Sequence, residues 1–192
     1  SLVGSEMCIR DRNNHNLVMW KLAEKGEYER LHKYIGKLRP LEKDRHRQWT
    51  QNLILDMILE YKLLAMEKKK ILYEIKTDMI GEIALADKEL CILLGNLLDN
   101  AIEACEKLEE EKRMVKIEVR KHHSMFMLIV ENSCEAHAQV RKGIFRTTKK
   151  DDRMHGYGIH NVRKTVKNHG GQFQYGSRGE NFYVKILIPL VI

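Results

Sequence analysis

Apolar residues recur with a helical period along the first part of the chain. Over residues 13–38 they recur about every three or four positions, with one wider gap around Gly26, and a second such run covers residues 42–70. Each run predicts an amphipathic helix with one buried face. Gly36 and Pro40 fall near the junction of the runs and favour a turn. The two helices therefore predict a hairpin, which buries little surface alone and is expected to pair with a second copy of the chain.

From residue 71 onward, strand-like and helix-like patterns follow one another. Helices are predicted over residues 87–109 and 158–169, and a long polar loop without apolar period over residues 133–156. Strand patterns are expected over residues 71–76, 114–120, 125–131, 171–176 and 181–188. This order of elements predicts an α+β fold, an α/β sandwich with helices on one face of a mixed sheet.

Composition and charge limit the classes of protein to which this chain can belong. The 192 residues contain no apolar run long enough to span a membrane, and the four cysteines show no metal-ligand spacing, which favours a cytoplasmic protein with reduced thiols. The net charge is +7, but the cations are interleaved with 27 acids. We therefore expect no nucleic-acid partner and no membrane contact within this chain. Residues 1–12 fit the neighbouring pattern poorly and are interpreted as a non-native leader.

The helix predicted over residues 87–109 carries unusual polar residues. Asn96, Asn100 and Glu103 are spaced i, i+4, i+7 and share one stripe beside the apolar face, whereas Asp99 points away from it and is expected to be solvated. Amide and carboxylate oxygens suit a hard cation such as Mg²⁺. The alternative is that the two asparagines only form local hydrogen bonds, since asparagine is unfavourable inside a helix.

Two further motifs follow. Asn132 ends an apolar strand, where a side-chain amide can read the edge of an adenine base or can simply begin a turn. Residues 147–150 (TTKK) supply hydroxyls and cations suited to phosphates. Gly156 and Gly158 then open a helix, where the backbone can approach a ligand closely and free N–H groups favour an anion. The spacing is that of neither a P-loop nor a Rossmann turn.

These motifs, in this order, resemble those of the GHKL (Bergerat) ATPases, a group that includes histidine kinases, type II topoisomerases, a class of heat-shock chaperones and MutL repair proteins. The residues that carry the resemblance read LLGNLLDNAIEA, VENS, TTKK and HGYGIHNV. Within the group, they are similar to the sensor histidine kinases of Gram-positive peptide quorum sensing, the AgrC-like type.

The resemblance implies ATP and Mg²⁺ as cofactors. Asn100 would hold the Mg²⁺ that bridges the ATP phosphates, and Asn96 would help to arrange the same site. Asn132 would occupy the adenine-reading position, where most of the superfamily has Asp. Residues 133–156 would form a lid over ATP. The implied phosphate contacts are Thr148, Lys149, Gly156 and Gly158.

The resemblance also implies a division of the chain and a set of partners. Residues 13–70 would form a dimerisation hairpin and residues 71–192 the ATP-binding kinase domain of a homodimer that passes its phosphoryl group to a response regulator. Such a protein would be the C-terminal cytoplasmic part of a membrane-bound sensor.

The phosphoacceptor histidine of these kinases lies in an Arg-His-Asp motif, followed after two residues by Asn-His. Here Asn14 and His15 match its end, but Ile9, Arg10 and Asp11 stand where Arg-His-Asp is expected. The acceptor is therefore missing, and self-phosphorylation of this chain is not expected. His15 is the available catalytic candidate, although a role in the hairpin is the preferred interpretation.

Two alternatives remain open at the level of sequence. One is a dimeric module that binds ATP without phosphotransfer. The other is a slow GHKL ATPase, although the hydrolysing members of the group carry a Glu base where this chain has Asn96.

Overall fold

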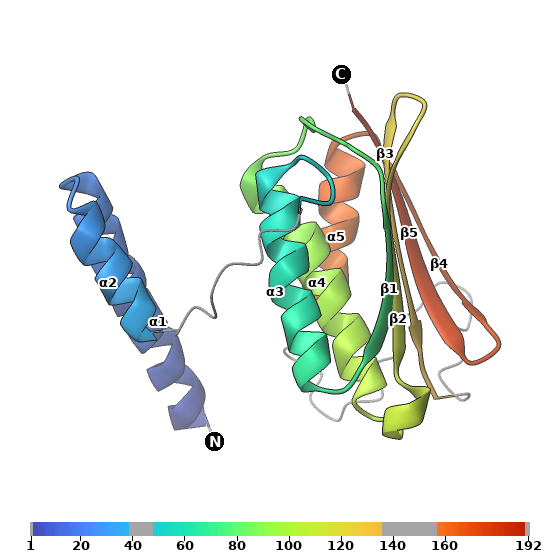
Figure 1. Cartoon of the computed structure of the whole chain (residues 1–192), viewed down its shortest axis with the longest axis horizontal. Coiled ribbons are helices and arrows are strands. Elements are labelled where there is room, and N and C mark those ends of the chain that lie inside the picture. The colour runs from blue at the N-terminus through green and yellow to red at the C-terminus, as the bar shows by residue number, and fades with distance from the viewer. Residues whose placement is uncertain (1, 39–47, 136–156, 191–192) are drawn as a thin grey trace. The chain divides into compact units, whose positions relative to one another are not determined.

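The computed structural model describes residues 2–38, 48–135 and 157–190 (Figure 1). The chain divides into two compact units, Ser1–Arg45 and His46–Ile192. None of the helices in the described ranges is long and apolar enough to cross a bilayer.

The first unit is a helical hairpin. Helix α1 covers Leu2–Glu24 and helix α2 covers Tyr28–Leu38. The sequence predicted one helix over residues 13–38, but Gly26 has a φ of +68° and ends it, because this left-handed conformation suits glycine and interrupts a right-handed helix. The α1 backbone also runs through the stretch interpreted as a leader, whose origin stays a prediction.

The helix predicted over residues 42–70 is shorter than expected, and it belongs to the second unit rather than to the hairpin. Helix α3 covers Leu53–Lys68 and begins at the cap Asn52, whose side chain accepts a hydrogen bond from the Leu55 N–H. Its apolar face is buried in the second unit, at Leu55, Leu59, Leu63 and Met66. A helical hairpin is therefore present, but α1 and α2 form it, and α3 contributes to the core of the other unit.

A mixed sheet of five strands is the centre of the second unit. Its strands are β1 (Leu72–Thr77), β2 (Met114–His122), β3 (Met125–Ser133), β4 (Gln172–Arg178) and β5 (Asn181–Pro189). The spatial order is β1-β2-β3-β5-β4, with β1 and β2 parallel and the other neighbours antiparallel. The predicted α+β fold with a mixed sheet is confirmed.

Three helices cover one face of this sheet (Figure 1). Helix α4 (Asp87–Cys105) packs against α3 on one side and against α5 (Tyr157–Asn168) on the other. Alternate residues of β2, β3 and β5 point toward the helices and are buried, as the period of a strand requires. The core therefore lies between the helical layer and the sheet, with α4 at its middle.

A pair of substitutions on α3 tests its place in the core. Leu59 is 0% exposed and Met57 is 52% exposed on the same helix. We expect Leu59→Ala to lower the free energy of unfolding by about 2–5 kcal/mol, since it leaves a cavity in the core. Met57→Ala should change it by less than about 0.5 kcal/mol. Urea denaturation of both variants measures the difference, and equal effects would place α3 outside the core.

Candidate functional site

Helix α4 presents two asparagines beside its buried face. Asn96 is half-buried, and its Nδ2 donates a hydrogen bond of 2.7 Å to the Ile92 carbonyl. The local bond considered as an alternative is thus formed, but it occupies only the amide nitrogen and leaves Oδ1 as an acceptor. Asn100, one turn later, is half-buried, and its side chain makes no hydrogen bond with any residue of the described ranges. Its amide oxygen is available to a ligand.

The start of α5 lies directly against Asn96. A Cβ atom added to Gly158 would lie 3.1 Å from Asn96 Oδ1 and 3.4 Å from Asn96 Cγ. A larger residue would therefore have to displace the asparagine side chain. Two motifs that are far apart in the sequence, the asparagines of α4 and the glycine in the first turn of α5, meet at this point.

Asn132 lies near the end of β3, on the face of the sheet that packs against α4. It is 5% exposed, and its Nδ2 donates a hydrogen bond of 2.8 Å to the Ser133 carbonyl. Because a carbonyl can only accept, this contact assigns the NH₂ group to that side and leaves Oδ1 as the free acceptor. An acceptor at this position suits an exocyclic amino group such as that of adenine.

The other predicted contacts are not placed. Thr148, Lys149 and Gly156 lie outside the described residues, and so does most of the loop predicted to form a lid.

Comparison with known families identifies the fold around these residues. The model of the GHKL domain matches residues 85–189, a range that includes Asn96, Asn100, Asn132 and Gly158. The chain belongs to the GHKL family. No curated protein matches it significantly.

Solved structures agree with the family at the level of the fold. The chain is similar to the nucleotide-free catalytic domain of the histidine kinase ThkA, at 23% identity and a TM-score of 0.59, over 72% of this chain and 91% of that one. The histidine kinase AdeS of Acinetobacter baumannii follows at 16% identity and 0.54, over 87% and 82%. Full-length ShkA in complex with AMPPNP is similar at 16% identity and 0.55, over 72% and 29%.

A pair of charged residues ties the asparagine-bearing helix of this GHKL domain to α3. Lys62 Nζ lies 2.5 Å from Asp99 Oδ1, and the Lys62 side chain is 11% exposed against 57% for Asp99. The expectation that Asp99 is only solvated is therefore wrong. The helical pattern directs Asp99 away from the apolar stripe of α4, and its partner lies on another helix, which the sequence did not reveal.

A second contact joins α4 to the far end of α5. Glu89 accepts hydrogen bonds from the Ala86 N–H at 3.0 Å and from His169 Nε2, 2.9 Å away, just after α5. The bond from His169 lowers the pKa of the Glu89 carboxyl, and the Ala86 N–H lowers it further against the effect of burial. The two helices are thus held at one end by Glu89 and in contact at the other through Asn96 and Gly158. Sequence reasoning missed both Glu89 and His169, although Glu at the third position of a helix is a capping signal.

Cys134, whose role the sequence left open, lies beside Asn132. Its N–H donates to the Glu180 carbonyl at 2.8 Å, and it lines a cavity of about 340 Å³ together with Leu108 and Asn181. Burial raises the pKa of its thiol, and the nearby Glu180 adds to that effect. The thiol therefore stays protonated at neutral pH and is a poor nucleophile.

The Glu89 contact predicts a specific dependence of stability on pH. Because the pKa of Glu89 is lowered in the folded state, its carboxylate stabilises the fold above the ordinary value of 4.5, and this contribution is lost as the pH falls through the lowered value. We expect Glu89→Gln to lower the free energy of unfolding by about 1 kcal/mol at pH 7 and by less at pH 3, where the carboxylate is further protonated. Urea denaturation at both pH values measures this.

The exposed Glu111 provides the control for that comparison. Glu111→Gln should behave like the parent chain at pH 7 and at pH 3. A loss in Glu89→Gln that is the same at both pH values would show that the charge of Glu89 contributes nothing.

Proposed function

We propose that this GHKL domain binds Mg·ATP and is the catalytic part of a sensor histidine kinase of a two-component system. The observation that carries the proposal is the close approach of Asn96 to Gly158, where an added Cβ atom would lie 3.1 Å from Asn96 Oδ1. Asn100 offers its side-chain amide one helical turn after Asn96. This arrangement joins a cation-binding stripe to a helix N-terminus suited to phosphates. The similarity of the fold to catalytic domains of histidine kinases supports the assignment.

Each residue has a part that its chemistry allows. Asn100 offers an amide oxygen as a ligand, and Asn96 helps to keep the glycine backbone of α5 at the site. When bound, Mg²⁺ supplies positive charge to the phosphates. Asn132 Oδ1 accepts from the amino group of adenine. Thr148, Lys149 and Gly156 are proposed as further phosphate contacts. Catalysis of this kind consists mostly of positioning and charge neutralisation.

The partners follow from the same proposal. The hairpin of α1 and α2 would dimerise two copies of the chain in the cytoplasm, and a response regulator would receive the phosphoryl group. The subtype is proposed from the sequence motifs alone, as that of the AgrC-like quorum-sensing kinases.

The position of His15 favours a role in the hairpin. Its Nδ1 lies 2.8 Å from Tyr34 Oη, so that one ring nitrogen joins α1 to α2. The contact engages Nδ1 only, so it holds the ring in the hairpin without excluding Nε2 as an acceptor. The incomplete acceptor motif, rather than this contact, favours the second candidate function for this chain, a module that binds ATP without phosphorylating itself.

Nucleotide binding can be tested at Asn100. We expect a fluorescent ATP analogue to bind the chain in the presence of Mg²⁺, and Asn100→Ala to weaken binding at least about 10-fold, a loss typical of changes around a metal ligand. Without Mg²⁺ the two proteins should differ little. Fluorescence titration with and without Mg²⁺ measures both.

Asn168→Ala is the matched control, because Asn168 is an exposed residue at the end of α5. It should bind like the parent chain. If the parent does not bind the analogue, or if Asn100→Ala binds equally well with Mg²⁺, the proposed site is wrong.

Phosphotransfer is a separate test. With ATP labelled at the γ-phosphate, we expect no acid-labile label on this chain, because its acceptor motif is incomplete. A label that disappears in His15→Gln would identify His15 as the acceptor. Steady ATP hydrolysis near about 1 s⁻¹, the low end of ordinary enzyme rates, would instead support the ATPase alternative.

A further inference from the structure

The outer face of α5 carries basic side chains and no acidic ones. His160, Arg163, Lys164 and Lys167 are spaced i, i+3, i+4, i+7, so that they form one stripe along the helix, and all four are exposed. No acid occurs between Tyr157 and Asn168. We refer to these four residues as the α5 basic stripe.

The stripe is not neutralised by the parts of the chain that the structure describes. Arg163 lies over the Phe173 ring, 6.0 Å from its centre, and none of the four residues forms an ion pair with a described carboxylate. The carboxylate that contacts the α5 end, Glu89, is already engaged by His169 and the Ala86 N–H. Like charges at i, i+4 destabilise a helix, so that this arrangement opposes folding in itself. An anion outside the described residues would relieve that repulsion.

The position of α5 makes the stripe accessible. Helix α4 packs between α3 and α5, which leaves α5 at the edge of the helical layer. Val162, Thr165 and Val166 are buried and turn the opposite side of α5 toward the core. The stripe therefore faces solvent and can meet a flat surface.

The composition of the stripe indicates the kind of partner. Stable protein interfaces are depleted in Lys and need a buried apolar or aromatic anchor at their centre. The exposed residues between Arg163 and Asn168 include no apolar side chain. A row of cations without an anchor suits a surface that attracts by charge alone, and a leaflet rich in anionic lipid attracts each nearby Lys or Arg in this way.

We propose that the α5 basic stripe docks this domain on anionic lipid headgroups. This differs from the expectation of no membrane contact, which considered the interleaved charges of the whole chain. Folding separates the charges, because the twelve residues of α5 contain no acid and place their cations on one side. The proposal goes beyond the proposed kinase function and does not depend on it.

Vesicle binding by the whole chain tests the proposal. The probes are phosphatidylcholine vesicles with and without 30% phosphatidylglycerol, used in co-sedimentation at a salt concentration of about 0.1 M, where the Debye length is still about 10 Å. Each stripe cation should contribute about 5-fold, so that Lys164→Gln with Lys167→Gln lowers binding about 30-fold. Lys164→Arg with Lys167→Arg should keep it.

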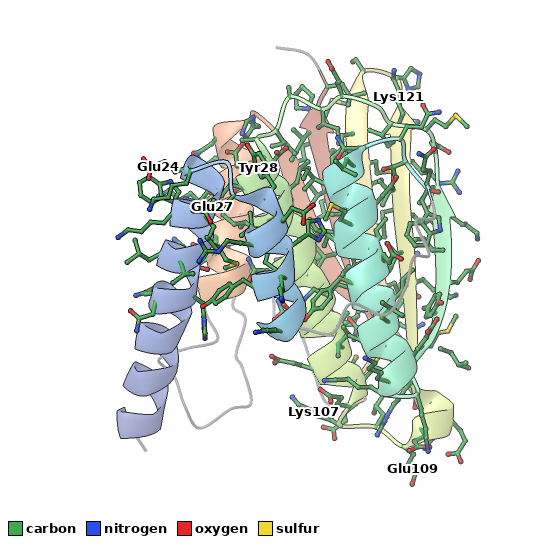
Figure 2. All side chains as sticks on the ribbon, turned by 60° about the vertical axis from the view of Figure 1, so that its left-hand side comes forward. Glu24, Glu27, Tyr28, Lys107, Glu109 and Lys121 are labelled. Atoms are coloured by element: carbon green, nitrogen blue, oxygen red, sulfur yellow. The ribbon has the colours of Figure 1, made fainter. Side chains whose placement is uncertain are left out.

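A matched control changes the net charge by the same amount elsewhere. Lys107 and Lys121 are exposed lysines outside α5 and are labelled in Figure 2. Lys107→Gln with Lys121→Gln should lower vesicle binding less than about 3-fold, because neither residue belongs to the stripe. If this double substitution lowers vesicle binding as much as Lys164→Gln with Lys167→Gln does, the effect comes from net charge and the proposal is wrong.

Other outcomes are also decisive. Absence of binding to the anionic vesicles, or equal binding to vesicles of phosphatidylcholine alone, would overturn the proposal. Displacement of the vesicles by duplex DNA or by an acidic protein at equal charge concentration would assign the stripe to that partner instead. Mg-dependent binding of the fluorescent ATP analogue, measured on every variant, reports an intact fold. A parent chain that binds the anionic vesicles but not the ATP analogue would contradict the kinase proposal and leave the lipid proposal standing.

Discussion

Burial of helix α4 is the constraint on which the second unit depends. Eight of its side chains are buried, and the helix packs against α3, α5 and strands of the sheet at once. Removing this much apolar surface from water is the dominant favourable contribution to folding. It also determines the rotation of α4 about its axis, since any other rotation would expose leucines and bury charges.

The polar residues of α4 are placed as a consequence of that rotation. Asp99 meets Lys62 of α3, and Asn96 meets Gly158 at the start of α5. Glu89 meets His169 at the other end of α5. The candidate site is therefore built from polar side chains of a helix whose apolar side chains fill the core. Asn96 is further held by its hydrogen bond to the Ile92 carbonyl.

The same packing separates the faces of α5. Its apolar side is directed toward α4 and the sheet, while its cations are left together on the outside. One helix thus begins at the proposed nucleotide site, with Gly158, and continues as a basic surface. This arrangement would place the proposed lipid-binding stripe and part of the proposed nucleotide site on one helix.

Much of the fold could be predicted because strand and helix periods differ clearly after residue 71. The five strands and helices α4 and α5 lie close to where the pattern placed them. The first part of the chain was harder. The wider gap at Gly26 was visible in the pattern, but only its positive φ shows that a helix ends there. The sequence marked Asn96 and Asn100 as unusual inside a helix. It did not show which of their side-chain atoms form hydrogen bonds within the described residues.

The sequence by itself determined which face of each helix is apolar, the order of the elements and the motifs of the GHKL family, since these depend on residue type and spacing. Tertiary structure alone decided what each apolar face is buried against. The apolar face of α3 could be buried in a helical hairpin or against a sheet. The burial of Leu59 and Met66 in the core of the second unit shows which of the two is formed. Tertiary structure likewise decided that Asp99 has a partner and that Asn96 lies next to Gly158, because the period of a sequence gives the direction of a side chain but not the neighbour in that direction.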